Sequence, residues 1–385
     1  MLLWGVRVAQ AVDIECYSLL NDWCIIFEPI EDGEPINIKF SSPRVIQSQV
    51  TGFTIGGKSG ATEIPSLFFE IFPATVSAHI RSGKVSVLRK KNFKFAKNLS
   101  NLELKGNRLR SISREVFTEA KKLNRVDLES NHITEIEDYA FSGASALTFV
   151  ILKNNLLTRI KKSTFAGAPL LNNIWLANNQ IETIEDGAFD LPKLKIIYLG
   201  NNKLKSLPAT IFAKSPLMEA IDVASNQLDR VGNIFYPLKQ LTLLRLENNQ
   251  VPDLDLMKFE NSKLNLLYLS NTSVQLPIAP PEAGNKFAAL QYLIMDNNRL
   301  SNPNIFEYLR MFKDLKWLDI SNNEFTHINN LEAIYHDFPH FERLRVHGNH
   351  FSCKWTEKEA DFDRRIFWLE GVDDYRNAIE NLPCE

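Results

Sequence analysis

The sequence lacks the features that would assign it to a simple functional class. The 44 Lys and Arg residues nearly balance the 46 Asp and Glu residues, so the net charge of -2 points to no nucleic-acid or membrane-surface partner. No stretch after the first residues reaches the roughly 18 apolar residues of a membrane span, so we expect a soluble mature chain. G-x-S-x-G, H-E-x-x-H and phosphate-loop sequences are also missing. The sequence therefore offers no candidate catalytic residues, and we predict no enzymatic activity and no cofactor.

Cysteine is scarce and is confined to the two ends of the chain. Cys16 and Cys24 lie near the start, Cys353 and Cys384 lie near the end, and none lies between. Structural thiols of a core would be scattered more evenly, so the distribution favours disulfides within two end caps, with reduced cysteines as the alternative.

The middle of the chain is a repeat. The stretches LSNLELKGNRL, LNRVDLESNHI, LTFVILKNNLL and LNNIWLANNQI share the template L-x-x-L-x-L-x-x-N-x-L with a spacing of 24 residues. The template starts at Leu99, Leu123, Leu147, Leu171, Leu194, Met218, Leu241, Leu264, Leu290, Leu315 and Phe341, with weaker copies at Val50 and Thr75.

The template predicts a solenoid. Each copy holds one short strand whose apolar residues at positions 1, 4, 6 and 11 are covered only when neighbouring copies stack. The Asn at position 9 has donors and acceptors for the backbone groups of the turn, so we expect an asparagine ladder. Lys58, Gly83 and Thr272 replace that Asn, and irregular turns are expected there.

These residues resemble the leucine-rich repeat family, in particular the 24-residue type of extracellular proteins, over residues 50–351. The resemblance implies an α/β-type repeat solenoid, a horseshoe with a parallel sheet on its concave side and irregular or short helical segments on its convex side. Among such proteins the chain looks most like the leucine-rich immune proteins of insects, especially mosquitoes, but without the C-terminal coiled coil through which some of them bind complement-like proteins.

The segments outside the repeats are interpreted as a leader and two caps. Residues 1–11 contain the A-x-A-like Ala9-Gln10-Ala11 and are read as a truncated signal peptide, with an N-terminal strand as the alternative. Residues 12–49 and 352–385 would cover the two open ends of the core. About thirteen strands at about 4.8 Å would separate the caps by roughly 60 Å, so only Cys16–Cys24 and Cys353–Cys384 can pair.

Two further groups of polar residues carry weaker signals. His336, His340, His347 and His350 lie close together in sequence, but Pro339 argues against a shared helix and no Cys or carboxylate has zinc-site spacing, so we predict no metal site. Asn98 and Asn271 begin N-glycosylation sequons, which are acceptors only if the chain is secreted.

Candidate binding residues lie at template positions 3 and 5, which alternate with the core positions and face away from it. Two apolar patches are predicted on this face, flanked by acidic Glu103, Asp127 and Glu129 and by basic Arg343 and Arg345. The first patch comprises Phe149, Ile151, Trp175, Ile196 and Tyr198, and the second comprises Leu243, Leu266, Tyr268, Tyr292, Ile294 and Trp317. Such aromatics also stabilise sheets by cross-strand pairing, which is the alternative reading.

The sequence therefore predicts a secreted, non-enzymatic recognition protein that binds a protein or other macromolecule through the concave face, and the resemblance to the immune proteins implies a role in innate immunity. A self-associating extracellular scaffold and a receptor ectodomain remain the alternatives.

Overall fold

The computed structural model describes residues 12–18, 22–27, 36–41, 46–56, 60–259, 262–276 and 289–358. It divides into two compact units, residues 1–194 and 195–385. The predicted leader, residues 1–11, lies outside the described residues.

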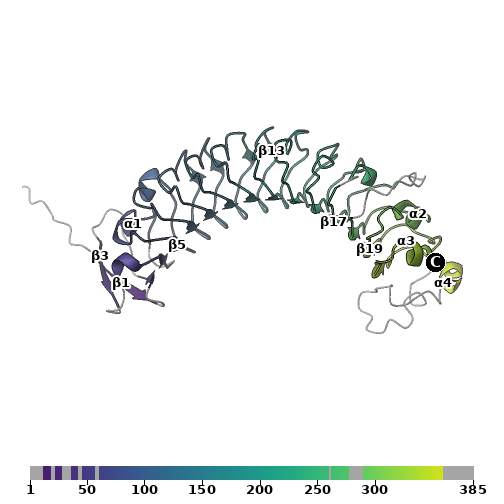
Figure 1. Cartoon of the computed structure of the whole chain (residues 1–385), viewed down its shortest axis with the longest axis horizontal. Coiled ribbons are helices and arrows are strands. Elements are labelled where there is room, and N and C mark those ends of the chain that lie inside the picture. The colour runs from purple at the N-terminus through teal and green to yellow at the C-terminus, as the bar shows by residue number, and fades with distance from the viewer. Residues whose placement is uncertain are drawn as a thin grey trace, which may run out of the picture. The chain divides into compact units, whose positions relative to one another are not determined.

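The first unit is built from short parallel strands joined by irregular segments (Figure 1). Its sheet has the strand order β12-β10-β8-β6-β5-β4-β2-β1-β3, and β1 and β2 form its antiparallel pair. The elements are β1 (Val12–Ser18), β2 (Trp23–Ile26), β3 (Ile36–Phe40), η1 (Gln47–Gln49), β4 (Gly52–Ile55), α1 (Leu67–Ile71), β5 (Ser77–Ile80), η2 (Lys90–Phe93), β6 (Asn101–Glu103), β7 (Ser111–Ile112), β8 (Arg125–Asp127), β9 (Glu135–Ile136), β10 (Phe149–Ile151), β11 (Arg159–Ile160), β12 (Asn173–Trp175) and β13 (Thr183–Ile184).

The second unit repeats the same plan with a parallel sheet of order β20-β19-β18-β17-β16-β15-β14. Its elements are β14 (Ile196–Tyr198), β15 (Ala220–Asp222), β16 (Leu243–Arg245), η3 (Leu256–Phe259), β17 (Leu266–Tyr268), β18 (Tyr292–Ile294), α2 (Ile305–Leu309), β19 (Trp317–Asp319), α3 (Ala333–Asp337), β20 (Arg343–Arg345) and α4 (Cys353–Lys358). The predicted parallel-sheet solenoid with little helix is thus confirmed.

The template explains the strands and the core. Position 4 is the middle residue of each three-residue strand and is buried, whereas positions 3 and 5 flank it on the opposite face of the sheet, here called the sheet face. In the copy that starts at Leu99, the side chains of Leu99, Leu102, Leu104 and Leu109 are all completely buried. Parallel strands in register stack these leucines from copy to copy, and the stack is the continuous core.

The asparagine ladder is present. Asn155 is typical: its side-chain amide donates to the carbonyls of Leu128 and Leu152, both at 3.0 Å, and its Oδ1 accepts the N–H of Ile133 at 3.0 Å. The same position holds Asn107, Asn131, Asn155, Asn179, Asn202, Asn226, Asn249, Asn298, Asn323 and Asn349, and each side chain bonds to turn backbone.

The expected irregular turns are confirmed at one position and wrong at another. Position 8 has a positive φ in the regular turns, and at the Thr272 turn Ser273 has a positive φ (58°) in addition to Asn271 (52°). At Gly83 the backbone is regular, because Ser82 keeps the usual positive φ of 52° and Asn107 of the next copy caps the turn. Lys58 lies outside the described residues.

Opposite the sheet, phenylalanines fill each coil of the first unit. Phe93, Phe117, Phe141, Phe165 and Phe189 form a buried stack with successive ring centroids 5.3, 5.8, 5.6 and 6.1 Å apart. Two short parallel pairs, β7 with β9 and β11 with β13, lie on this side of the coils.

The N-terminal strands close the open end of the first sheet. Antiparallel β1 and β2 carry the buried Cys16 and Cys24, which form the predicted disulfide with a Cα separation of 5.2 Å. Trp23 packs across Gly52 onto the His79 ring at 4.9 Å, and a Cβ on Gly52 would lie 2.3 Å from the indole. Glycine is therefore required where the cap meets the first repeat.

The last described residues cover the end of the second unit. Trp355 in α4 stacks on Phe351 at 4.4 Å and donates its indole N–H to the carbonyl of Ile328 at 3.0 Å. Cys353 is disulfide-bonded, and its predicted partner Cys384 lies outside the described residues.

Candidate sheet-face binding site

The predicted binding residues lie on the sheet face of both units, and the structure divides the first patch between them. Phe149, Ile151 and Trp175 belong to β10 and β12 of the first unit, whereas Ile196 and Tyr198 belong to β14 of the second. The second patch lies wholly in the second unit, on β16 to β19.

In the first unit, Phe149 and Trp175 form an edge-to-face aromatic pair with centroids 4.9 Å apart. The Arg125 guanidinium lies over the Phe149 ring at 4.3 Å, and the Lys153 ammonium lies 5.8 Å from the Trp175 ring. Both rings are half-buried, which leaves part of each available to a partner.

Ile151 is a correction to the predicted patch, because its side chain is only 1% exposed. It lies in register with Trp175 and on the same strand as Phe149, whose ring contacts the indole. A short aliphatic side chain between larger neighbours loses its exposure even though the strand alternation points it to the sheet face. Ile151 therefore supports the aromatic pair and cannot contact a partner in this arrangement.

In the second unit, the predicted residues form rows across strands that are in register. Leu243, Leu266, Tyr292 and Trp317 are successive partners at position 3, and Tyr268 and Ile294 are partners at position 5. All six side chains are half-buried. The ring centroids of Tyr292 and Trp317 lie 6.3 Å apart. The Arg245 guanidinium lies 5.4 Å from the centroid of the Tyr268 ring, and the Arg343 guanidinium lies 5.2 Å from that of the Trp317 ring.

The acidic residues beside the first patch are far less exposed than the sequence pattern suggested. The pKa of Asp127 is raised, mainly by burial and further by the negative charges of Glu129 and Glu103. The hydrogen bond from the backbone N–H of Glu129 and the positive charge of Arg125 lower this pKa but do not cancel the effect of burial. For Glu103, burial is also the largest effect, but the hydrogen bond from Arg81 and the charges of His79 and Arg81 outweigh it and lower the pKa. Glu103, Asp127 and Glu129 are all largely covered, and each lies within 4.0 Å of a Lys or Arg side chain.

Lys153 and the cation–aromatic contacts were not predicted. Lys153 lies at template position 7, which also faces away from the core at the end of the strand, and extending the alternation by two residues would have found it. The contact of Arg125 with Phe149 follows from adjacent copies of position 3.

The histidine cluster does not come together. Helix α3 contains His336 but ends at Asp337, so His340 lies outside it, as Pro339 predicted. Within the described ranges, no group of three His, Cys, Asp or Glu side chains could hold a metal ion.

The two sequons differ in accessibility. The Asn98 side chain donates to the Pro73 carbonyl at 3.0 Å and accepts from Lys122 at 2.8 Å. Asn271 is exposed at a turn, where its amide donates to the Asn248 side chain at 3.1 Å.

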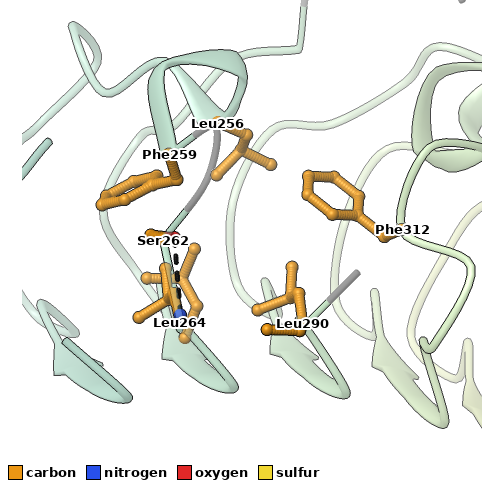
Figure 2. A pocket seen from close by; sticks show the side chains of 8 residues that line it. Leu256, Phe259, Ser262, Leu264, Leu290 and Phe312 are labelled. Atoms are coloured by element: carbon orange, nitrogen blue, oxygen red, sulfur yellow. Dashed lines mark hydrogen bonds between the residues drawn. The ribbon is translucent and has the colours of Figure 1, made fainter. Parts of the chain in front are cut away.

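A cavity in the second unit lies in the core, away from the sheet face (Figure 2). It has room for about one water molecule, ≈ 10 Å³, and is lined mainly by apolar side chains, including Leu256, Phe259, Leu290 and Phe312. Ser262 is the one polar side chain of the lining, and its hydroxyl accepts the backbone N–H of Leu264 at 3.4 Å. A lining without converging polar groups marks a packing gap and not a ligand site.

Comparison with known families agrees with this architecture. Residues 62–190 match the BspA type leucine rich repeat region in six copies, and residues 169–228 and 192–251 match the leucine rich repeat model. The protein is a leucine-rich repeat protein. A search of curated proteins finds no match.

Solved structures share the fold at low sequence identity. The Toll–Spatzle complex of Drosophila aligns with a TM-score of 0.64 and 21% identity, over 79% of this chain and 45% of that one. Internalin InlF from Listeria monocytogenes aligns with a TM-score of 0.63 and 17% identity, over 82% of this chain and 87% of that one. The TLR13–ssRNA13 complex aligns with a TM-score of 0.56 and 19% identity, and this chain spans 53% of that chain. No helix within the described ranges is long and apolar enough to cross a membrane.

Proposed function

We propose that this protein is a recognition protein that binds another macromolecule through the sheet face, and that it acts outside the cell in innate immunity. The single observation that carries the proposal is the row of half-buried apolar and aromatic side chains on the sheet face of the second unit, which ends at Trp317. Contiguous apolar surface rimmed by charged groups is typical of interaction sites, and Trp and Tyr dominate binding hot spots.

Trp317 has a feature that sheet stabilisation does not explain. Its indole Nε1 is buried, and among the residues described it has no hydrogen-bond partner. A leucine or a phenylalanine at this position would pack against Tyr292 and Arg343 without leaving a polar group unpaired. The half-buried indole ring beside Tyr292 and Arg343 is the part of Trp317 that a partner can contact.

Two further observations support the immune and extracellular parts of the proposal. Toll in its complex with Spatzle, described as a hub in development and innate immunity, has the same fold, as does TLR13 with ssRNA13. The disulfide between Cys16 and Cys24 suits an oxidising compartment. The likeness to insect leucine-rich immune proteins and glycosylation of Asn98 and Asn271 belong to the same proposal. We expect no catalytic activity and no cofactor.

The test is substitution of the two tryptophans, Trp175→Ser and Trp317→Ser, with Tyr335→Ser as the control. Tyr335 is an exposed aromatic residue on α3, away from the sheet. Each variant is compared with the native chain for capture of partners from the extracellular fluid of the source organism and for melting temperature. Loss of capture with an unchanged melt supports the proposal, whereas unchanged capture with a lowered melt assigns the tryptophans to the sheet.

Two further measurements address the alternatives. A solution mass far above that of one chain would favour the self-associating scaffold. The mass of the protein secreted by insect cells, before and after enzymatic deglycosylation, reports whether either sequon carries a glycan; no change would remove both sites.

A further inference from the structure

Four ion pairs on the sheet face of the first-unit repeats share one arrangement, in which the carboxylate is covered and the Lys or Arg side chain is the more exposed partner. The exposed fractions of the side chains decide this. The cations are the more exposed partners: Arg81 is 56% exposed, Lys105 50%, Arg125 33% and Lys153 34%. The carboxylates beneath them are less exposed: Glu103 is 17% exposed, Asp127 12%, and Glu129, which pairs with both Lys105 and Lys153, 10%. The pair of Lys39 and Asp13 on the N-terminal strands differs, because both of its side chains are more than half exposed.

Side-chain length and the turn backbone explain the arrangement. Asp127 is short, and its Oδ1 accepts the backbone N–H of Glu129 at 3.0 Å where the strand passes into the turn. Glu129 is held from both sides, by the ammonium groups of Lys105 at 3.0 Å and Lys153 at 3.4 Å. The acids are therefore fixed close to the sheet, and the longer Lys and Arg side chains can pair with them only from above.

The second unit shows the same layering independently. The Arg245 side chain is 44% exposed above Asp222 and Glu247, at 17% and 12%. Arg345 lies over Asp319, which is nearly buried and also accepts the backbone N–H of Ser321. The sheet faces thus present guanidinium and ammonium groups although the chain as a whole has a net charge of -2.

The outermost cations also adjoin the aromatic rings. Arg125 covers Phe149, and Lys153 lies between Glu129 and the Trp175 ring. An apolar side chain that enters this surface therefore meets an aromatic ring and a cation within one strand spacing.

We propose that this part of the sheet face binds an acidic segment of a protein, in which Asp or Glu residues alternate with aromatic or aliphatic residues. The inference rests on the proposed function, because it names the chemistry of the partner at the same face. Each carboxylate of the segment would accept hydrogen bonds from Arg125 or Lys153, and its apolar neighbours would contact Phe149 and Trp175.

A nucleic acid fits the same surface less well. Phosphate tracking needs a continuous line of cations that release counterions on binding, whereas Arg125 and Lys153 each lie against an aromatic ring. Isolated carboxylates next to apolar groups match paired cations beside aromatic rings better than a continuous polyanion does.

The experiment selects displayed random peptides of about 12 residues, which span about 40 Å when extended, on the full-length native chain. The double variant Arg125→Gln/Lys153→Gln removes two outward cations. The control Lys121→Gln/Lys193→Gln makes the same change of charge at exposed positions outside the strands. Circular dichroism and melting temperature confirm that all three chains are folded.

We expect the native chain and the control to enrich peptides rich in Asp, Glu and aromatic residues, and the double variant to lose that enrichment. The best selected peptide should bind the double variant at least about tenfold more weakly than it binds the native chain. A version of this peptide with Asn and Gln in place of Asp and Glu should bind the native chain at least about tenfold more weakly than the acidic peptide does. Its affinity should also fall as salt rises from about 0.05 to about 0.5 M.

Several outcomes overturn the inference. They are no enriched peptide, enrichment that the double variant keeps, an amide peptide that binds as tightly as the acidic one, and tighter binding of a poly(U) oligonucleotide than of the selected peptide. If the double variant keeps the enrichment and Trp175→Ser loses it, the acidic partner is rejected, but the sheet face is still supported as the recognition site.

Discussion

Asn155 offers the sharpest test of how the repeat is held together. Its side chain satisfies one backbone N–H, that of Ile133, and the carbonyls of Leu128 and Leu152, all at 3.0 Å, and only 5% of the residue is exposed. In Asn155→Ala the side chain becomes too short to bond. The carbonyls of Leu128 and Leu152 keep the hydrogen bonds from Asn131 and Asn179, but the buried N–H of Ile133 loses its partner, so we expect a loss of about 1–3 kcal/mol.

A threonine at the same position should be intermediate, because the protein contains the precedent. The Thr272 hydroxyl donates to the carbonyl of Leu269 at 2.7 Å, three residues before it, as an asparagine would. In Asn155→Thr the bond to Leu152 can therefore persist, while the bonds to Leu128 and Ile133, in the preceding copy, are lost. We expect about half the destabilisation of Asn155→Ala.

The assay is chemical denaturation followed by circular dichroism, combined with hydrogen exchange of the Ile133 amide. The control is Asn124→Ala, since Asn124 is exposed and makes one side-chain bond, to the Ala146 carbonyl at 3.2 Å. The control should cost no more than about 1 kcal/mol. Equal stabilities of Asn155→Ala and Asn124→Ala, or an Ile133 amide that stays protected in Asn155→Ala, would refute the ladder as a main source of stability.

Three other predictions follow from backbone strain, packing and burial of charge. Gly167 has a φ of +88° and an added Cβ would lie 2.9 Å from the backbone of the preceding copy, whereas Gly232 has a φ of +54° with open space around it. Melting temperatures should therefore fall much further for Gly167→Ala than for Gly232→Ala, whose cost is about 1–2 kcal/mol from the left-handed backbone alone. Ala289 lines the gap of ≈ 10 Å³ and is half-buried, so Ala289→Val can expand toward solvent and should change the melting temperature little, while Ala168→Val, at a completely buried site, should lower it by overpacking worth about 1–3 kcal/mol. Burial raises the pKa of Asp127 above its ordinary value of 3.8, so the favourable contribution of the protonated carboxyl to stability is complete below that pH and is lost as the pH rises through the folded-state pKa. The melting temperature of Asp127→Asn relative to the native chain should consequently increase as the pH rises above 3.8, and a pH-independent difference would contradict the burial of this charge.

Much of this protein could be predicted from its sequence, because a repeat states the same local constraint many times. One template aligned along the chain predicted the strands, the buried leucines and the asparagine ladder, and the confinement of cysteine to the two ends of the chain predicted the bond between Cys16 and Cys24. A feature that occurs once was harder to judge. The regular turn at Gly83 was missed because the compensating group, Asn107, comes from the next copy and not from the turn itself.

The alternation of a strand decides which face a side chain points to, and the sequence alone determined that for each candidate residue. How far the side chain reaches into solvent depends on its neighbours across the sheet, which come from other copies and differ in length. Only the tertiary structure therefore decided that Ile151 is buried beside Trp175, that Glu129 lies beneath Lys105 and Lys153, and that the Arg125 guanidinium covers the Phe149 ring. The physical reason is that exposure on a packed sheet is a relative quantity, set by the longest side chain within about 4.8 Å on either side.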